Sequence, residues 1–163
     1  MKFFAYTDGA HRVGSADIAS SFYIRTGKDY ITMKTFALHG RNAVVAECLA
    51  IGLACEWLLN NKPCLSKEDT VIIISDSKAA IDIINRVRDT ENNISENKAD
   101  VKNKEESRNN IKNPSIALAI EQLEELKEKC NVDFQKIKAH KNTINGNYVA
   151  DRLAKCALAL AGV

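Results

Sequence analysis

Four acidic residues stand where a carboxylate is either costly or well placed to bind a ligand. Glu47 lies within an apolar helical pattern, where burying a charge is unfavourable unless a partner such as a metal ion is present. Asp76 stands just after a run of β-branched residues, at the end of a strand where ligand sites gather in α/β sheets. Asp8 follows an apolar segment, and Asp151 lies in the first turn of the last predicted helix. Carboxylates brought together would favour Mg²⁺ or Mn²⁺.

Each of these acids also has an ordinary structural interpretation. Asp8 and Gly9 form one of the commonest turn dipeptides. Glu47 could lie on the solvent edge of its helix, and Asp76 could cap the helix that follows. The helix dipole would favour Asp151 whether or not it has a catalytic task. The positions alone therefore leave both interpretations open at every one of the four.

The elements that must position the acids follow from hydrophobic periodicity. We predict strands over residues 3–6, 18–24, 30–38, 71–74 and 132–137, and helices over residues 43–60, 77–87, 116–130 and 148–160. The continuous β-branched run at 71–74 is typical of a strand buried on both faces in a sheet with a parallel portion. The order is three strands, a helix, a strand, two helices, a strand and a helix, which predicts an α/β fold.

Composition bounds the class of protein. A chain of 163 residues is the size of one domain, and we expect a single catalytic domain over 1–163. Hydrophobic residues make up 45% and charged residues 27%, as in ordinary globular proteins. We expect no membrane span, no secretory signal and a cytoplasmic location. The net charge of +2 neither supports nor excludes a nucleic-acid partner.

The segment at about 88–113 is polar, carries both signs of charge and contains no aromatic residue. We predict a solvated surface insertion there rather than a nucleic-acid contact. The five cysteines form no CxxC pair, so a cysteine metal site is not expected. Cys48, Cys55 and Cys156 lie in apolar helical patterns, which favours buried free thiols.

Taken together, the motifs around the four acids resemble those of the ribonuclease H family, type 1. The resemblance is carried by Tyr6-Thr7-Asp8-Gly9, Val45-Ala46-Glu47, Ser75-Asp76-Ser77, Lys138-Ala139-His140 and Ala150-Asp151-Arg152-Leu153-Ala154-Lys155. It spans nearly the whole chain. Any single motif would be weak, but the motifs occur in the right order on the expected succession of strands and helices.

The resemblance implies a ribonuclease H-like fold, in which a five-stranded mixed sheet, three antiparallel strands followed by two parallel ones, is flanked by helices. It implies that Asp8, Glu47, Asp76 and Asp151 hold two Mg²⁺ ions, with Mn²⁺ as a substitute. The implied activity is hydrolysis of the RNA strand of an RNA/DNA hybrid, leaving 5′-phosphate and 3′-hydroxyl ends. One ion would activate the attacking water and the other would stabilise the leaving 3′-oxygen.

The resemblance also extends to His140, which is similar to a histidine on a mobile loop before the last acid. A role in proton transfer or product release suits imidazole, whereas the alternative is an ordinary surface histidine. Selectivity for RNA requires contacts with 2′-hydroxyl groups in the minor groove. Our candidates for contacting the substrate are Gly9, Ala10, His11, Asn42, Lys78 and Asn147.

The sequence departs from the family pattern just before the helical glutamate, where Ala43-Val44 follow Asn42 in place of two adjacent asparagines. That change motivates an alternative, a non-catalytic module that binds RNA/DNA hybrids. A second alternative is another nuclease of the same fold, such as a resolvase or an exonuclease. We expect a monomer whose affinity for the hybrid is weak and falls with salt. The sequence does not separate a stand-alone enzyme from a reverse-transcriptase domain or a phage-encoded copy.

Overall fold

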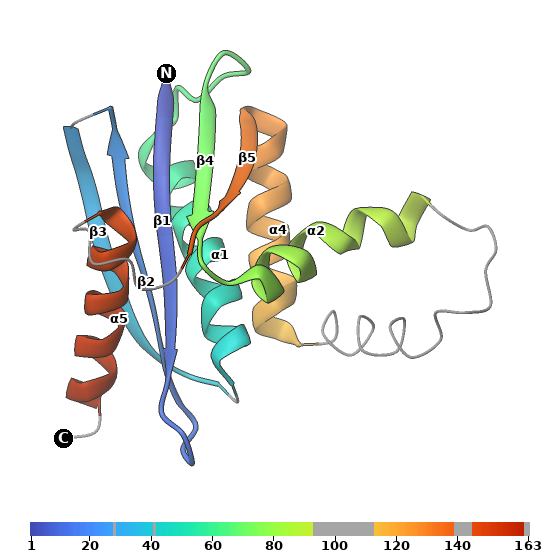
Figure 1. Ribbon diagram of the computed structural model, residues 1–163. Coiled ribbons are helices and arrows are strands. Elements are labelled where there is room, and N and C mark those ends of the chain that lie inside the picture. Colours follow the sequence, from blue (N-terminus) through green and yellow to red (C-terminus); the bar gives the residue numbers. More distant parts are fainter. Residues whose placement is uncertain (28, 41, 93–112, 139–144, 162–163) are drawn as a thin grey trace.

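The computed structural model describes residues 1–27, 29–40, 42–92, 113–138 and 145–161, with the side chains of 86–92 left aside. Five strands and four helices lie within these ranges (Figure 1). The strands are β1 (Lys2–His11), β2 (Asp17–Thr26), β3 (Asp29–His39), β4 (Thr70–Ser75) and β5 (Asn131–Lys136). The helices are α1 (Ala43–Asn61), α2 (Lys78–Asn92), α4 (Pro114–Lys129) and α5 (Gly146–Ala161).

The strands form one mixed sheet in the order β3-β2-β1-β4-β5. β1, β2 and β3 pair antiparallel, whereas β4 pairs parallel with both β1 and β5. The expected fold, three antiparallel strands followed by two parallel ones, is confirmed. β4 lies between β1 and β5, which explains why its β-branched side chains are apolar on both faces.

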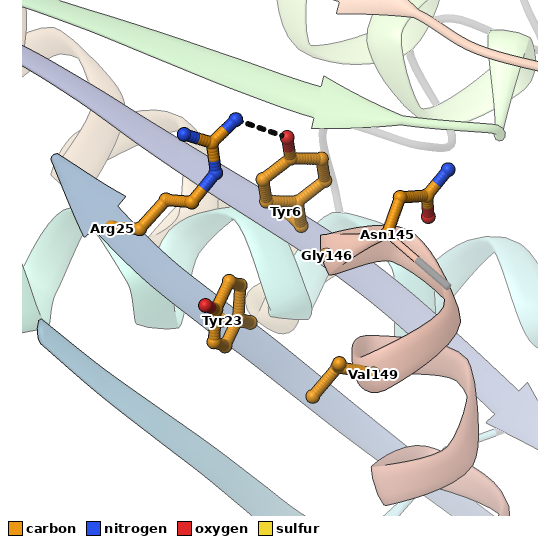
Figure 2. A pocket seen from close by; sticks show the side chains of 6 residues that line it. All are labelled: Tyr6, Tyr23, Arg25, Asn145, Gly146 and Val149. Atoms are coloured by element: carbon orange, nitrogen blue, oxygen red, sulfur yellow. Dashed lines mark hydrogen bonds between the residues drawn. The ribbon is translucent and has the colours of Figure 1, made fainter. Parts of the chain in front are cut away.

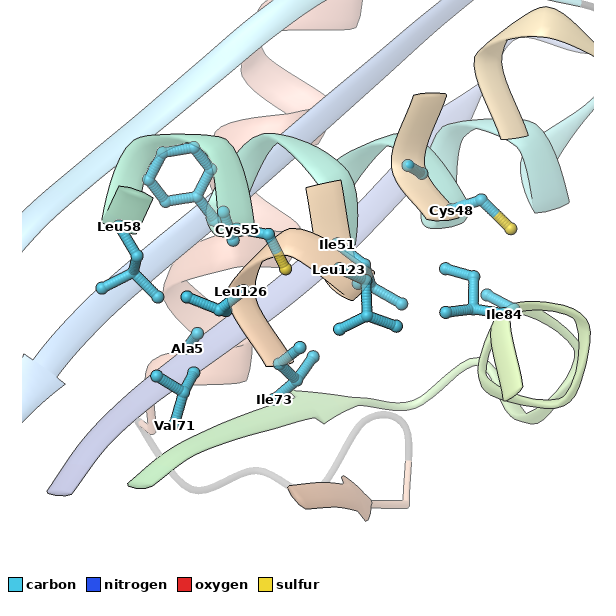
Figure 3. Packing of buried hydrophobic residues seen from close by; sticks show 14 of the residues in the cluster. Ala5, Cys48, Ile51, Cys55, Leu58, Val71, Ile73, Ile84, Leu123 and Leu126 are labelled. Atoms are coloured by element: carbon cyan, nitrogen blue, oxygen red, sulfur yellow. The ribbon is translucent and has the colours of Figure 1, made fainter. Parts of the chain in front are cut away.

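Helices cover both faces of the sheet. α1 and α4 pack on one face and α5 on the other (Figure 1). The main core lies between the sheet and the α1–α4 pair, where side chains such as Ile51, Ile73 and Leu123 interdigitate and Ile84 of α2 joins them (Figure 3). A smaller cluster, formed around Tyr6, Ile74 and Ala150, lies beneath α5.

α1 is the helix at the centre of this core. It is the one helix of the described chain long and apolar enough, by length and composition, to cross a membrane. Its apolar character is accounted for by burial against the sheet and α4. At Gly52 an added Cβ would lie 2.7 Å from the Cα of Ala119, so the backbones of α1 and α4 are in contact there.

Several predicted boundaries are wrong, and three of them bear on the site or on the expected insertion. β1 does not end at Tyr6 but continues to His11, so Asp8 and Gly9 pair with β2 instead of forming a turn. α2 runs to Asn92, five residues past the predicted end, and takes in the start of the expected insertion. α5 begins at Gly146 rather than at residue 148. In the first case pairing with β2 overrides the local turn preference, which is a tertiary effect.

The prediction for the cysteines is partly wrong. Cys48 and Cys55 are buried as expected, but Cys156 is exposed on α5. An apolar helical pattern does not tell which face of a short terminal helix meets the sheet. The remainder of the predicted insertion, residues 93–112, lies outside the described residues.

Candidate metal centre

The register between β1 and β4 brings two of the four acids to the same edge of the sheet. Tyr6 pairs with Ile74 in the last pair of the parallel register. Asp8 and Asp76 each lie two residues beyond that pair. β1 continues beside β2 whereas β4 ends at Ser75, so the two carboxylates stand where the strands separate. This is the carboxyl end of β4, where α/β sheets place their ligands.

The third acid is brought to this edge by close contact between β1 and α1. A Cβ added at Gly9 would lie 2.5 Å from the backbone nitrogen of Glu47, a distance that real Cβ atoms do not tolerate. Only glycine permits this approach of strand to helix. Asn42 caps the same helix, because its Oδ1 accepts a hydrogen bond of 3.0 Å from the N–H of Val45. Glu47 is thereby placed beside Asp8, the neighbour of Gly9.

The capping interpretation of Asp76 is not supported. The hydroxyl of Ser77 accepts a 3.2 Å hydrogen bond from the N–H of Ala80, and its carbonyl accepts from Ile81. The N-terminus of α2 is therefore capped by Ser77, which leaves the Asp76 carboxylate for another role.

Asp8, Glu47 and Asp76 form a compact acidic triad. Their candidate ligand atoms all lie within 4.8 Å of one another. Asp8 is only 5% exposed and Glu47 only 8%, whereas Asp76 is half-buried. The backbone N–H of Gly9 donates a 3.0 Å hydrogen bond to Asp8 Oδ1.

The triad is electrostatically incomplete without a cation. Burial, followed by the negative charges of Asp76 and Asp151, raises the pKa of Asp8 to about 7. Burial, followed by the charges of Asp8 and Asp76, raises the pKa of Glu47 to about 9. The buried Glu47 Oε2 has no hydrogen-bond partner among the described residues. A set of hard oxygen ligands with an unsatisfied buried oxygen fits a divalent cation such as Mg²⁺.

Asp151 lies near the triad but is not part of the compact cluster. Its charge contributes to the raised pKa of Asp8, and its carboxylate forms a 2.7 Å ion pair with Lys155 one turn later on α5. Asn145 caps α5 by accepting from the N–H of Tyr148, so the helix starts early and Asp151 falls in the second turn, not the predicted first. We did not anticipate Lys155 as its partner, although the i,i+4 spacing could have indicated it.

The remaining predicted residues occupy varied positions. Gly9 and Ala10 lie inside β1, and the ring of His11 makes a 3.2 Å hydrogen bond with the carbonyl of Ser15 across the β1–β2 hairpin. Lys78 is exposed as the first residue of α2. Asn147 is buried in the first turn of α5, where its Oδ1 has no partner among the described residues. His140 lies outside the described residues.

The strand order, the helices on both faces and the compact acidic triad define a ribonuclease H-like fold with a site suggestive of a nuclease. The family described as RNase H matches residues 1–159, and the chain therefore belongs to the RNase H family. No curated protein sequence matches the chain.

Solved structures share this fold along their whole length at low sequence identity. RNase H1 from the halophilic archaeon Halobacterium salinarum NRC-1 is 16% identical, with a TM-score of 0.64 over 98% of each chain. The N-terminal RNase H domain of a Mycobacterium tuberculosis protein is 15% identical, with a TM-score of 0.66 over 99% of this chain and 96% of that one. LC11-RNase H1, in complex with an RNA/DNA hybrid, is 17% identical, with a TM-score of 0.67 over 99% of each chain; it was isolated from compost by a metagenomic approach.

Proposed function

We propose that this chain is an endoribonuclease that hydrolyses the RNA strand of RNA/DNA hybrids with two divalent metal ions, leaving 5′-phosphate and 3′-hydroxyl ends. The observation that carries the proposal is the triad of Asp8, Glu47 and Asp76, in which Asp8 and Glu47 are buried and one Glu47 oxygen has no partner among the described residues. Membership of the RNase H family supports it, as does the RNA/DNA hybrid bound to LC11-RNase H1.

The chain's own residues contribute position and charge. Asp8 and Asp76 are fixed by the hydrogen-bonded register of β1 and β4, and Glu47 by the contact of α1 with Gly9. Together with Asp151 they would hold the two ions. When bound, Mg²⁺ would neutralise these carboxylates, supply a reactive water at neutral pH and stabilise charge on the leaving 3′-oxygen.

Substrate selection would depend on groups around this edge of the sheet. Lys78 is exposed at the start of α2, beside Asp76, and could contact a phosphate. The side chain of Asn42 is committed to capping α1, so its contribution would be to hold Glu47 in place. We assign His140 to proton transfer or product release, on the family resemblance alone.

The direct test is cleavage of a labelled RNA/DNA hybrid beside double-stranded RNA, double-stranded DNA and single-stranded RNA. Each is incubated with Mg²⁺, with Mn²⁺ and with a chelator. We expect cutting of the hybrid alone, only with metal, with loss of activity in Asp76→Asn. A matched control is Asp133→Asn, which removes an exposed carboxylate from β5 and should cut like the wild type.

Other outcomes would identify the alternatives. Hybrid binding without cleavage by either metal would indicate a binding module. Cleavage of a different nucleic acid would indicate another nuclease of the same fold.

A further inference from the structure

A pocket lies on the face of the sheet that α5 covers. It has a volume of about 360 Å³ and is lined by Tyr6, Tyr23, Arg25, Asn145, Gly146 and Val149 (Figure 2). Its floor comes from β1 and β2, and its wall from the first turn of α5.

Arg25 supplies a cation to this pocket. Its guanidinium lies 4.5 Å from the centre of the Phe4 ring and donates a 3.0 Å hydrogen bond to the hydroxyl of Tyr6. It also donates to the carbonyl of Gly27. Within the described part of the chain, no carboxylate forms an ion pair with Arg25. Because a guanidinium has five N–H donors, donors remain for an anionic ligand.

Aromatic rings continue from the pocket across the sheet. The ring centres of Tyr6 and Tyr23 are 6.0 Å apart, and those of Tyr23 and Tyr30 are 5.8 Å apart in a stacked arrangement. Tyr30 is exposed at the outer end of this row. Tyr6 is buried and Tyr23 is half-buried, so these rings form a wall beside the Arg25 cation, which suits recognition of a phosphate.

The pocket is built on β1 and α5, the elements that also carry Asp8 and Asp151. Tyr6 and Asp8 are two residues apart on β1 and therefore lie on the same face. Two residues of a β-strand span about 6.7 Å. α5 contributes Gly146 and Val149 to the pocket and Asp151 to the neighbourhood of the triad. A nucleic-acid strand that runs through the triad would therefore also pass the pocket.

We infer that this pocket binds one nucleotide of the RNA strand near the scissile phosphate, with its phosphate on the Arg25 guanidinium and its ribose against Tyr23. The inference rests on the proposed function. Because a phosphate contact carries no sequence information, the pocket would strengthen binding and fix the position of the strand without selecting a base.

The test compares three single substitutions in an Asp76→Asn background, which prevents cleavage. Affinity for the RNA/DNA hybrid is measured by fluorescence anisotropy over a series of KCl concentrations. Arg25→Met removes the charge but keeps the apolar stem, and Arg25→Lys keeps the charge. Lys129→Met is the matched control, because it removes one exposed positive charge at the last turn of α4.

We expect Arg25→Met to bind about ten-fold more weakly, as for loss of one charge-assisted hydrogen bond. The slope of log K against log salt should become shallower by about 0.9, as for loss of one phosphate contact. Arg25→Lys should retain the wild-type slope, and Lys129→Met should change neither quantity. A thermal unfolding scan accompanies each variant.

A second measurement uses hybrids in which single RNA phosphates near the cleavage site are replaced by neutral linkages. One position should weaken binding of the Arg25-containing protein and of Arg25→Lys but have little further effect on Arg25→Met or, should that variant not fold, on Arg25→Gln. Absence of any such position, or an unchanged salt slope in a folded Arg25→Met, overturns the pocket assignment. If the pocket assignment fails but the wild type still cleaves the hybrid, the proposed function stands. If the wild type neither binds nor cleaves the hybrid, the pocket assignment and the proposed function are both wrong.

Discussion

Glu47 is a buried carboxyl group with one oxygen unpartnered among the described residues, and this decides the effect of replacing it. Glu47→Gln removes a charge that is costly to bury and that repels Asp8. In metal-free protein at pH 9 we expect the free energy of unfolding to rise by about 1–3 kcal/mol, or a few degrees in Tm. Thermal unfolding in the presence of a chelator measures the gain in metal-free stability of Glu47→Gln. Repeating the measurement with Mg²⁺ measures how much of the stabilisation by metal this variant has lost.

The matched control is Glu56→Gln, because Glu56 is exposed on the same helix. It should leave both the metal-free stability and the Mg²⁺ response unchanged. If Mg²⁺ raised the Tm of Glu47→Gln as much as that of the wild type, Glu47 would not be a ligand.

The raised pKa values of Asp8 and Glu47 also predict how stability depends on pH. Their pKa values rise from 3.8 and 4.5 to about 7 and about 9 in the folded protein. The folded chain therefore binds more protons than the unfolded chain across this interval. The stabilisation is complete below about pH 4 and is lost as pH rises through these folded-state pKa values, so metal-free stability should fall between pH 5 and pH 9. Asp69 does not cancel this fall in stability, because its pKa is lowered and its titration changes stability only below that pH interval.

Urea unfolding at several pH values, with a chelator, measures this slope. Saturating Mg²⁺ should flatten it, because the ion favours the charged carboxylates and stabilises the native state by mass action. A metal-free stability that rose from pH 5 to pH 9 would contradict the electrostatic account of the triad.

Among the elements, the β1–α1 contact at Gly9 links the fold to the site. Gly9→Ala would place a Cβ 2.5 Å from the backbone of Glu47, and neither backbone can yield as a flexible side chain could. We expect a loss of stability of about 1–3 kcal/mol from overpacking. Displacement of α1 from β1 should also weaken Mg²⁺ binding, which calorimetric titration would measure.

Gly52→Ala provides the comparison, because it creates a similar clash with Ala119 at the α1–α4 contact. It should destabilise the protein by a similar amount while Mg²⁺ affinity in the folded protein is retained. Equal losses of Mg²⁺ affinity in the two variants would mean that the Gly9 contact has no special part in the metal site.

The elements show what a sequence can and cannot predict. The parallel placement of β4 and the helical environment of Glu47 follow from local pattern, and the structure contains both. The continuation of β1 through Asp8 does not follow from local pattern, because pairing with β2 overrides a dipeptide that favours a turn. The pocket around Arg25 depends on register between distant segments, so no local pattern indicates it.

For the molecule as a whole, the cysteines report on packing. Cys48, Cys55 and Cys130 are buried, and burial raises the pKa of the Cys48 and Cys55 thiols to about 12. Only Cys64 and Cys156 are exposed. We expect two of the five thiols to react rapidly with a thiol reagent in the native protein, and all five after unfolding. Rapid reaction of more than two native thiols would show that the core opens more readily than its packing implies.

The parallel register of β1 and β4 has a consequence for ion choice. Neighbouring strands lie about 4.8 Å apart because backbone hydrogen bonds fix that spacing. The Tyr6–Ile74 pair therefore fixes the separation of the two strands just before Asp8 and Asp76, and substitution of the acidic side chains cannot adjust it. An ion that demands short, regular ligand distances suits such a frame better than a larger ion with a flexible shell. Discrimination between cations of different radius would then be encoded in main-chain geometry, and it would persist through changes elsewhere that preserve the sheet.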